Sequence, residues 1–198
     1  MSKKIRRVPV TLDAGNVTDI PDNEIKMIMR GADEMISVAG RSMLVKLLKG
    51  SKDKKILELG LDKCPAYGFY KDLKAEEVSN RVDWCIKHDY LRIIYDYRLP
   101  VIIFSPKGWE IEKETYAQEL YARLVKEIKL KNKKTVKEMD KVHRDVKFRI
   151  AEIAGEQATI EMIDTLDLWK SKEVKKIASA INKAEEKIVS RNDNQAET

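Results

Sequence analysis

Two tyrosines and an arginine lie close together in a short link between two β-prone runs. They are Tyr95, Tyr97 and Arg98, in a place where a purely structural turn more often uses Asn-Gly or Asp-Gly. An exposed aromatic ring can stack on a terminal base pair while a neighbouring guanidinium binds a phosphate, and such stacking contributes about 1–3 kcal/mol per base. These residue types predict contact with a nucleic acid. In the alternative interpretation, Tyr95 packs across the strand pair and Tyr97 covers the sheet edge.

Lysine is concentrated in two further places. The first is a group of five lysines around the single acid Asp53, namely Lys46, Lys49, Lys52, Lys54 and Lys55. The second spans residues 126–149, which contain ten basic and four acidic residues, and its central run holds Lys131, Lys133 and Lys134. This excess of six equals the net charge of the whole chain, +6. Lysines bind phosphates without selecting a base sequence. Stabilisation of a helix C-terminus, or simple solvation, is the alternative role for both groups.

Residues for catalysis or metal binding are sparse. Cys64 and Cys85, with His88 and His143, do not supply the closely spaced ligand pairs of a structural zinc site, and two buried thiols are the simpler interpretation. Residues 143–145 match a His-Arg-Asp tripeptide of the kinase catalytic loop, but the other kinase motifs do not accompany it. The sequence therefore predicts no cofactor, no metal and no enzymatic activity.

The elements that position the tyrosines form one supersecondary unit. An amphipathic helix is predicted over residues 41–49 and a second over residues 75–88. The turn-rich segment of residues 62–73 between them is expected to hold a short helix. The runs 90–95 and 99–104 can pair only antiparallel, because the link between them is so short. Three helices followed by a β-hairpin form a winged helix. We therefore predict a mainly α fold with a small β-hairpin wing, typical of nucleic-acid-binding modules.

The helix over residues 75–88 occupies the position of a recognition helix. Its apolar stripe faces the core, and its opposite face carries Arg81 beside the acids Glu76, Glu77 and Asp83. Three outward carboxylates would oppose docking on a phosphate backbone. We therefore expect the hairpin, more than this helix, to contact the ligand, and we keep Arg81 as a candidate.

This region resembles the RQC domain that follows the motor in RecQ helicases. The resemblance rests on Gly40-Arg41-Ser42-Met43-Leu44, Leu48-Lys49-Gly50-Ser51, Leu59-Gly60, Tyr67-Gly68 and Asp89-Tyr90-Leu91. It implies the DNA-binding part without the motor, and a role in DNA repair or replication. In some RecQ helicases an aromatic residue at the wing tip separates the strands at a duplex end, which would be the role of Tyr97. The chain departs from the family at Leu61, usually His, and at Cys64-Pro65, usually Leu-Ser.

The remaining segments complete the expected domain organisation. Residues 1–20 are expected to form an N-terminal arm, and Asp22 to cap a helix that joins the winged-helix domain, residues 21–112. Ser105-Pro106 begins the next helix, and residues 135–138 read as a capping box that restarts a helix. We expect residues 113–190 to form a helical domain and residues 191–198 a frayed tail.

The last third of the chain resembles HEAT-type repeats. The pattern appears one and a half times, in residues 145–155, 158–168 and 173–181, with small residues that let neighbouring helices approach. An ordinary amphipathic helical bundle is the alternative, since solenoids commonly need about three repeats.

Three classes of function follow. The first is a non-enzymatic protein that binds duplex or structured DNA, or RNA. The second is an adaptor that binds a protein through the HEAT-like helices, and the third is an enzyme of unrecognised type. The chain has no apolar run of about 18 residues and no apolar stretch behind its N-terminal basic residues, so we expect a cytoplasmic protein with no membrane partner.

Overall fold

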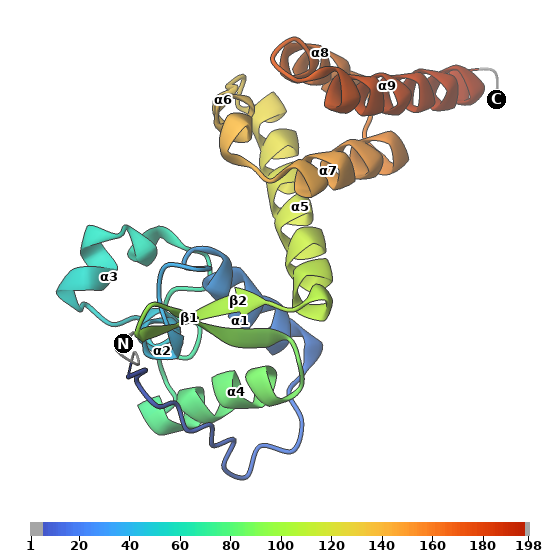
Figure 1. Cartoon of the computed structure of the whole chain (residues 1–198). Helices are drawn as coiled ribbons and strands as arrows, with labels where there is room; N and C mark the ends of the chain where they lie inside the picture. Colours follow the sequence, from blue (N-terminus) through green and yellow to red (C-terminus); the bar gives the residue numbers. More distant parts are fainter. Residues whose placement is uncertain (1–5, 197–198) are drawn as a thin grey trace. The chain divides into compact units, whose positions relative to one another are not determined.

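The computed structural model describes residues 6–196 and divides the chain into two compact units. The first ends at Glu112 and the second begins at Lys113. Helices predominate, and the described residues contain a single two-stranded sheet. The predicted fold class, mainly α with a small hairpin wing and a helical C-terminal segment, is confirmed (Figure 1).

The helices of the first unit enclose one apolar core. They are α1 (Asp22–Asp33), α2 (Arg41–Leu48), α3 (Lys54–Glu58), the short η1 (Leu61–Lys63) and α4 (Ala75–Lys87). Ile28, Leu44 and Val82 are fully buried at the centre of this core. Pro21, and not Asp22, occupies the N-cap of α1. The sequence analysis missed α3, which begins after Asp53, whose carboxylate accepts a 2.9 Å hydrogen bond from Lys55 N.

The predicted hairpin is present as β1 (Leu91–Asp96) and β2 (Leu99–Phe104). The strands are antiparallel with Asp96 opposite Leu99, so only Tyr97 and Arg98 form the turn. Leu91 and Ile102 are fully buried and fix the sheet on the core. The outer edge of β2 is covered by the segment after α1, because Ile102 N donates to Ala39 O at 3.0 Å.

The hairpin leads directly into α5 (Pro106–Lys129). Ser105 caps this helix as predicted, since its hydroxyl accepts a 3.0 Å hydrogen bond from Gly108 N. Gly108 lies so close to the first strand that a Cβ added to it would stand 1.9 Å from Tyr90 O. The absence of a side chain at this position is therefore what lets the start of α5 approach β1.

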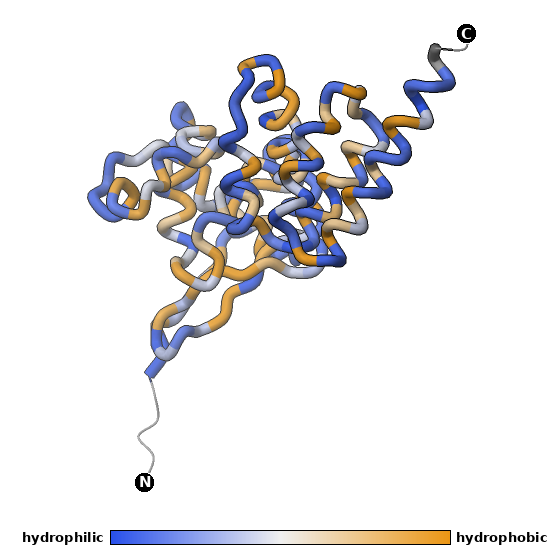
Figure 2. The backbone as a smooth tube through the Cα atoms, turned by 90° about the horizontal axis from the view of Figure 1, so that it is seen from above, coloured by the Kyte–Doolittle hydropathy of each residue, from blue (hydrophilic) through white to orange (hydrophobic). Residues whose placement is uncertain are grey.

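The second unit is entirely helical in its described residues. After α5 come α6 (Lys134–Glu138), η2 (Met139–Lys141), α7 (Arg144–Gln157), η3 (Ile160–Met162), α8 (Ile163–Lys170) and α9 (Lys175–Ala196). Its core includes Ile150, Leu166, Trp169 and Ile181. Figure 2 shows hydrophobic and hydrophilic residues alternating along the turns of the C-terminal helix, as expected for a helix with one buried face. The HEAT-type arrangement of these helices stays a prediction.

Two predictions about this unit are wrong. The predicted tail is helical up to Ala196, and the Arg191 guanidinium donates to Gly155 O and Ala158 O at 3.0 and 2.6 Å. The predicted capping box does not form either. Lys133 is the N-cap of α6, and Thr135 donates from its N–H and its hydroxyl to the Glu127 carboxylate instead. In both cases a contact distant in sequence replaces the local one.

We expect Gly108→Ala to lower the free energy of unfolding by at least about 2 kcal/mol, because Tyr90 O must move away from the new Cβ. This loss would occur although alanine is about 1 kcal/mol better than glycine within a helix. Urea unfolding of the full chain measures it. The matched control is Gly31→Ala in α1, where the added Cβ would meet only side-chain atoms, at 3.1 Å or more. Equal effects of the two substitutions would contradict this account.

Candidate nucleic-acid interface

Tyr97 stands at the tip of the wing in a strained conformation. It is the first residue of the two-residue turn, its φ is +51°, and 70% of its surface is exposed. A bulky residue with positive φ is an outlier, and such a conformation costs about 1–3 kcal/mol. Because the ring remains so exposed, packing offers little compensation for that strain. The tip therefore presents an aromatic ring to solvent.

Tyr95 and Arg98 attach the wing to the N-terminal segment. The Tyr95 hydroxyl donates to Val8 O at 2.9 Å, and Val8 N donates to Arg98 O at 3.0 Å. Arg98 Nε donates to Arg6 O at 3.1 Å, and the Arg7 guanidinium lies 4.9 Å from the centre of the Tyr95 ring. The predicted arm is thus held along the hairpin from residue 6 onward. Its contacts brace the wing directly below Tyr97.

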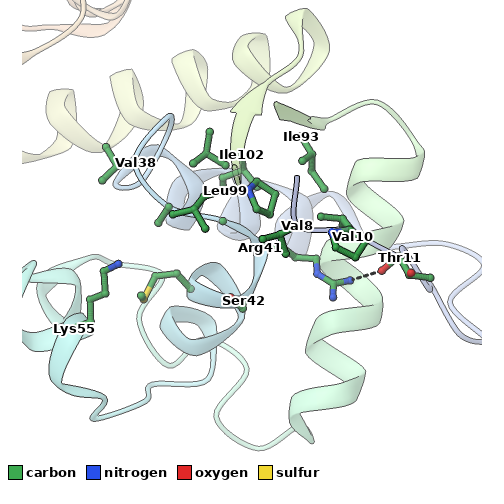
Figure 3. A pocket seen from close by; sticks show the side chains of 16 residues that line it. Val8, Val10, Thr11, Val38, Arg41, Ser42, Lys55, Ile93, Leu99 and Ile102 are labelled. Atoms are coloured by element: carbon green, nitrogen blue, oxygen red, sulfur yellow. Dashed lines mark hydrogen bonds between the residues drawn. The ribbon is translucent and has the colours of Figure 1, made fainter. Parts of the chain in front are cut away.

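A buried carboxylate anchors this N-terminal segment to the helices. Asp83 of α4 is 1% exposed, accepts a 2.8 Å hydrogen bond from Asp13 N and pairs with the Arg41 guanidinium. Arg41 also donates to Thr11 O at 3.2 Å, as the dashed line in Figure 3 shows. The expectation that Asp83 lies on the outward face of the recognition helix is therefore wrong. Its charge is used inside the domain.

Arg81 is also engaged within the domain. Its Nε donates to the Glu24 carboxylate at 3.2 Å, and its guanidinium lies 5.5 Å from the centre of the Tyr70 ring. The Tyr70 hydroxyl donates to the same Glu24 carboxylate at 2.6 Å, and burial raises the pKa of Tyr70. Arg81 thus joins α4 to α1, which leaves it less free to bind a ligand than the sequence suggests.

The five lysines of the first group divide into two kinds. Lys49 is structural, because its ammonium donates to the carbonyl oxygens of Lys71, at 2.6 Å, and Leu73. Lys46 pairs with Asp53 at 2.7 Å, and this hydrogen bond, with a second from Lys55 N, lowers the pKa of the Asp53 carboxyl.

The other three, Lys52, Lys54 and Lys55, are exposed on or beside α3. Lys54 makes a loose, exposed pair with Glu58 at 3.6 Å.

A groove of about 430 Å³ connects this lysine group with the wing. Its walls come from residues 8–11, the segment before α2, and β2 (Figure 3). Val38 and Leu99, which are 68% and 63% exposed, line the groove together with Lys55. The structure thus brings Lys55 and strand β2 of the wing to the same concave surface, which sequence analysis did not foresee.

The connector lysines lie in the second unit. Lys131, which has φ +51°, and Lys133 are in the link between α5 and α6, and Lys134 is the first residue of α6. All three are exposed, and Lys134 pairs with Glu138 at 3.9 Å. Their role in binding stays a prediction.

Other chemistry finds little support among the described residues. Both cysteines are buried, and burial raises the pKa of the Cys85 thiol to about 12, which keeps it protonated at neutral pH. Within residues 6–196, no group of three or more His, Cys, Asp or Glu side chains is placed to hold a metal ion. None of the helices in this part of the chain is long and apolar enough to span a membrane.

Substitution of the two kinds of lysine should have different effects on stability. Lys49→Gln should lower the free energy of unfolding by about 1–3 kcal/mol, because the carbonyl oxygens of Lys71 and Leu73 lose a charged donor. Lys52→Gln, its matched control, should leave stability within about 0.5 kcal/mol, since the Lys52 side chain is exposed. Thermal and urea unfolding of both variants provide the measurement. A destabilised Lys52 variant beside an unaffected Lys49 variant would reverse the assignment.

Comparison with known proteins supports the family resemblance seen in the sequence. The sequence model of the RQC domain matches residues 18–131. Over 104 residues the chain is 31% identical to "ATP-dependent DNA helicase RecQ" of Bacillus subtilis (strain 168), a match that covers 50% of this chain but only 17% of the helicase. No solved structure matches. Both matches connect the chain with RecQ helicases, and the chain spans only a small part of the helicase's length. The chain belongs to the RQC domain family.

Proposed function

We propose that this chain binds duplex or structured nucleic acid without catalysing a reaction, and that the wing tip acts at a duplex end or junction. The single observation that carries the proposal is Tyr97, which is 70% exposed in a strained turn. Strained and exposed aromatic residues are costly to the fold, and such outliers cluster at functional sites. Here the ring stacks on the last base pair, which contributes about 1–3 kcal/mol.

The bracing of the wing supports this role. A wedge opposes base stacking only if its backbone resists displacement, and the contacts of Val8 with Tyr95 and Arg98 hold the hairpin from its outer side. Arg98 uses Nε and its carbonyl oxygen for this contact, which leaves the remaining guanidinium N–H groups for a phosphate. Arg7 adds a second positive charge beside the Tyr95 ring.

The lysines around α3 extend the interface. Lys52, Lys54 and Lys55 are exposed, and Lys55 lines the groove that reaches Leu99 on the wing. A duplex whose end meets Tyr97 would carry its phosphates along this surface. Lysine contacts of this kind fix the position of a duplex without reading its sequence.

DNA is the first ligand to test, because the similar protein is a DNA helicase by name. RNA presents the same phosphates and stackable bases and belongs in the same experiment. We further propose that the chain acts in DNA repair or replication in the cytoplasm.

Tyr97→Asn should weaken binding and strengthen the fold at the same time. Asparagine tolerates positive φ, so the free energy of unfolding should rise by about 1 kcal/mol. Loss of the ring should abolish any preference for a blunt end or fork over a covalently closed duplex of the same length. Fluorescence anisotropy with the four ligands, blunt duplex, fork, closed duplex and RNA hairpin, measures the preference, and urea unfolding measures stability.

Two controls make this test specific. Tyr97→Phe keeps the ring and should keep the preference, while Tyr95→Phe removes only the hydroxyl that donates to Val8 O. A Tyr97→Asn variant that keeps its preference for ends would contradict the wedge. If the wild type binds none of the ligands at low salt, nucleic-acid binding itself is wrong, and the search moves to a protein partner of the helical unit.

A further inference from the structure

The second unit contains a groove that none of the preceding arguments uses. It lies between α7 and α9 and has a volume of about 390 Å³. Small residues form its floor, because a Cβ added to Gly155 would stand 3.1 Å from the Cα of Ala184. Ala151 and Ala180 line the same space. The two helices therefore approach closely, and longer side chains on both sides form the walls.

One edge of α9 supplies cations to this groove at helical spacing. Lys176, Lys183 and Lys187 all line it and are all exposed. Positions 176, 180, 183, 187 and 191 follow one another at intervals of three or four residues, so they share one edge of the helix. Four of these five residues are basic and none is acidic. Phe148 of α7, half-buried, and the exposed Ser179 complete the lining.

The charge of this edge is not balanced inside the protein. Among the described residues, none of Lys176, Lys183 and Lys187 forms an ion pair. Some other lysines of the unit are paired, such as Lys147 with Glu173 at 2.6 Å and Lys170 with Glu185.

The acid on the opposite wall of the groove, Glu152, shares Arg149, at 3.2 Å, with Glu114, at 2.6 Å. An anion entering the groove would meet three unpaired ammonium groups on the α9 side and this one carboxylate on the α7 side.

We infer that the α7–α9 groove is a second binding site for a nucleic-acid strand, separate from the wing. From Lys176 to Lys187 the edge is about 16 Å long at 1.5 Å per residue, which equals the axial rise of about five stacked nucleotides at 3.4 Å each. A row of lysines matches a row of phosphates, and the Phe148 ring offers a face on which a base can stack. This inference rests on the proposed binding of nucleic acid by the chain.

The test uses the full chain and a fluorescein-labelled single strand, with anisotropy measured over a range of salt. The variant is Lys183→Gln/Lys187→Gln, and the matched control is Lys172→Gln/Lys175→Gln, which removes two exposed lysines that do not line the groove. Two lost phosphate contacts should reduce the slope of log affinity against log salt by about 1.4. Between about 50 and 200 mM salt, wild-type affinity should then fall about sevenfold more than that of the variant.

The control variant should keep the wild-type slope, and unfolding midpoints of both variants should match the wild type. Equal slopes for the groove variant and its control would overturn the inference. So would an oligoglutamate peptide that displaces the strand at an equal concentration of charge, because the groove would then be a site for acidic peptides. Absence of any binding to the single strand at low salt would overturn it as well.

The wing and the groove give separate readouts. Tyr97→Asn alters the preference for duplex ends and leaves the salt slope on a single strand unchanged, whereas the lysine variant does the opposite. If Tyr97→Asn changes the end preference but Lys183→Gln/Lys187→Gln leaves the salt slope unchanged, only the groove inference is wrong. If the lysine variant changes the slope but Tyr97→Asn leaves the end preference unchanged, only the proposed role of Tyr97 is wrong.

Discussion

The contact between the half-buried Arg41 and the buried Asp83 is the constraint on which the first unit depends. It joins α2 to α4, and the same two side chains bind the backbone of Thr11 and Asp13. The N-terminal segment anchored in this way continues to Val8, which binds both sides of the wing tip. Removing one partner of a fully buried pair costs about 3–5 kcal/mol, and the loss of Arg41 should cost less than that because its side chain is partly exposed. In this domain the loss would also release the segment that braces Tyr97, so stability and the proposed binding share one anchor.

Charge in this protein has two uses that composition alone does not separate. Lys49, Arg81 and Asp83 are held by hydrogen bonds or ion pairs within the domain, whereas Lys52 is exposed and Lys55 is exposed in the lining of the groove. In the second unit the ion pair between Lys170 and Glu185 lies on the α8 side of α9, and the unpaired lysines line the α7 side. The net charge of +6 therefore does not show which charges are paired within the fold and which remain exposed.

Features that depend on interactions between residues close in sequence could be predicted, and features that depend on distant residues could not. The helix spacing, the Ser105 cap and the hairpin with its tip at Tyr97 depend on neighbours in sequence, and all three are present. The role of Asp83 depends on Asp13, 70 residues away, and no local pattern reveals it.

Two further features show the same limit. The groove beside the wing needs three distant segments at once, so periodicity alone could not find it. Two local patterns do indicate structure that was not predicted. Asp53 is a typical N-cap residue before α3, and the β-branched residues of Val8-Pro9-Val10-Thr11 favour an extended segment.

The proposed contact of the Tyr97 ring with the last base pair of a duplex can be measured with the fluorescent base aminopurine placed in that terminal pair. Opening or stacking of that pair by the Tyr97 ring changes its fluorescence. We expect the aminopurine fluorescence to change when the wild-type protein binds a duplex labelled in its terminal pair. We expect no change when the aminopurine lies in the middle of the same duplex. Bound protein that leaves the terminal signal unaltered, or alters both positions equally, would contradict the proposed contact.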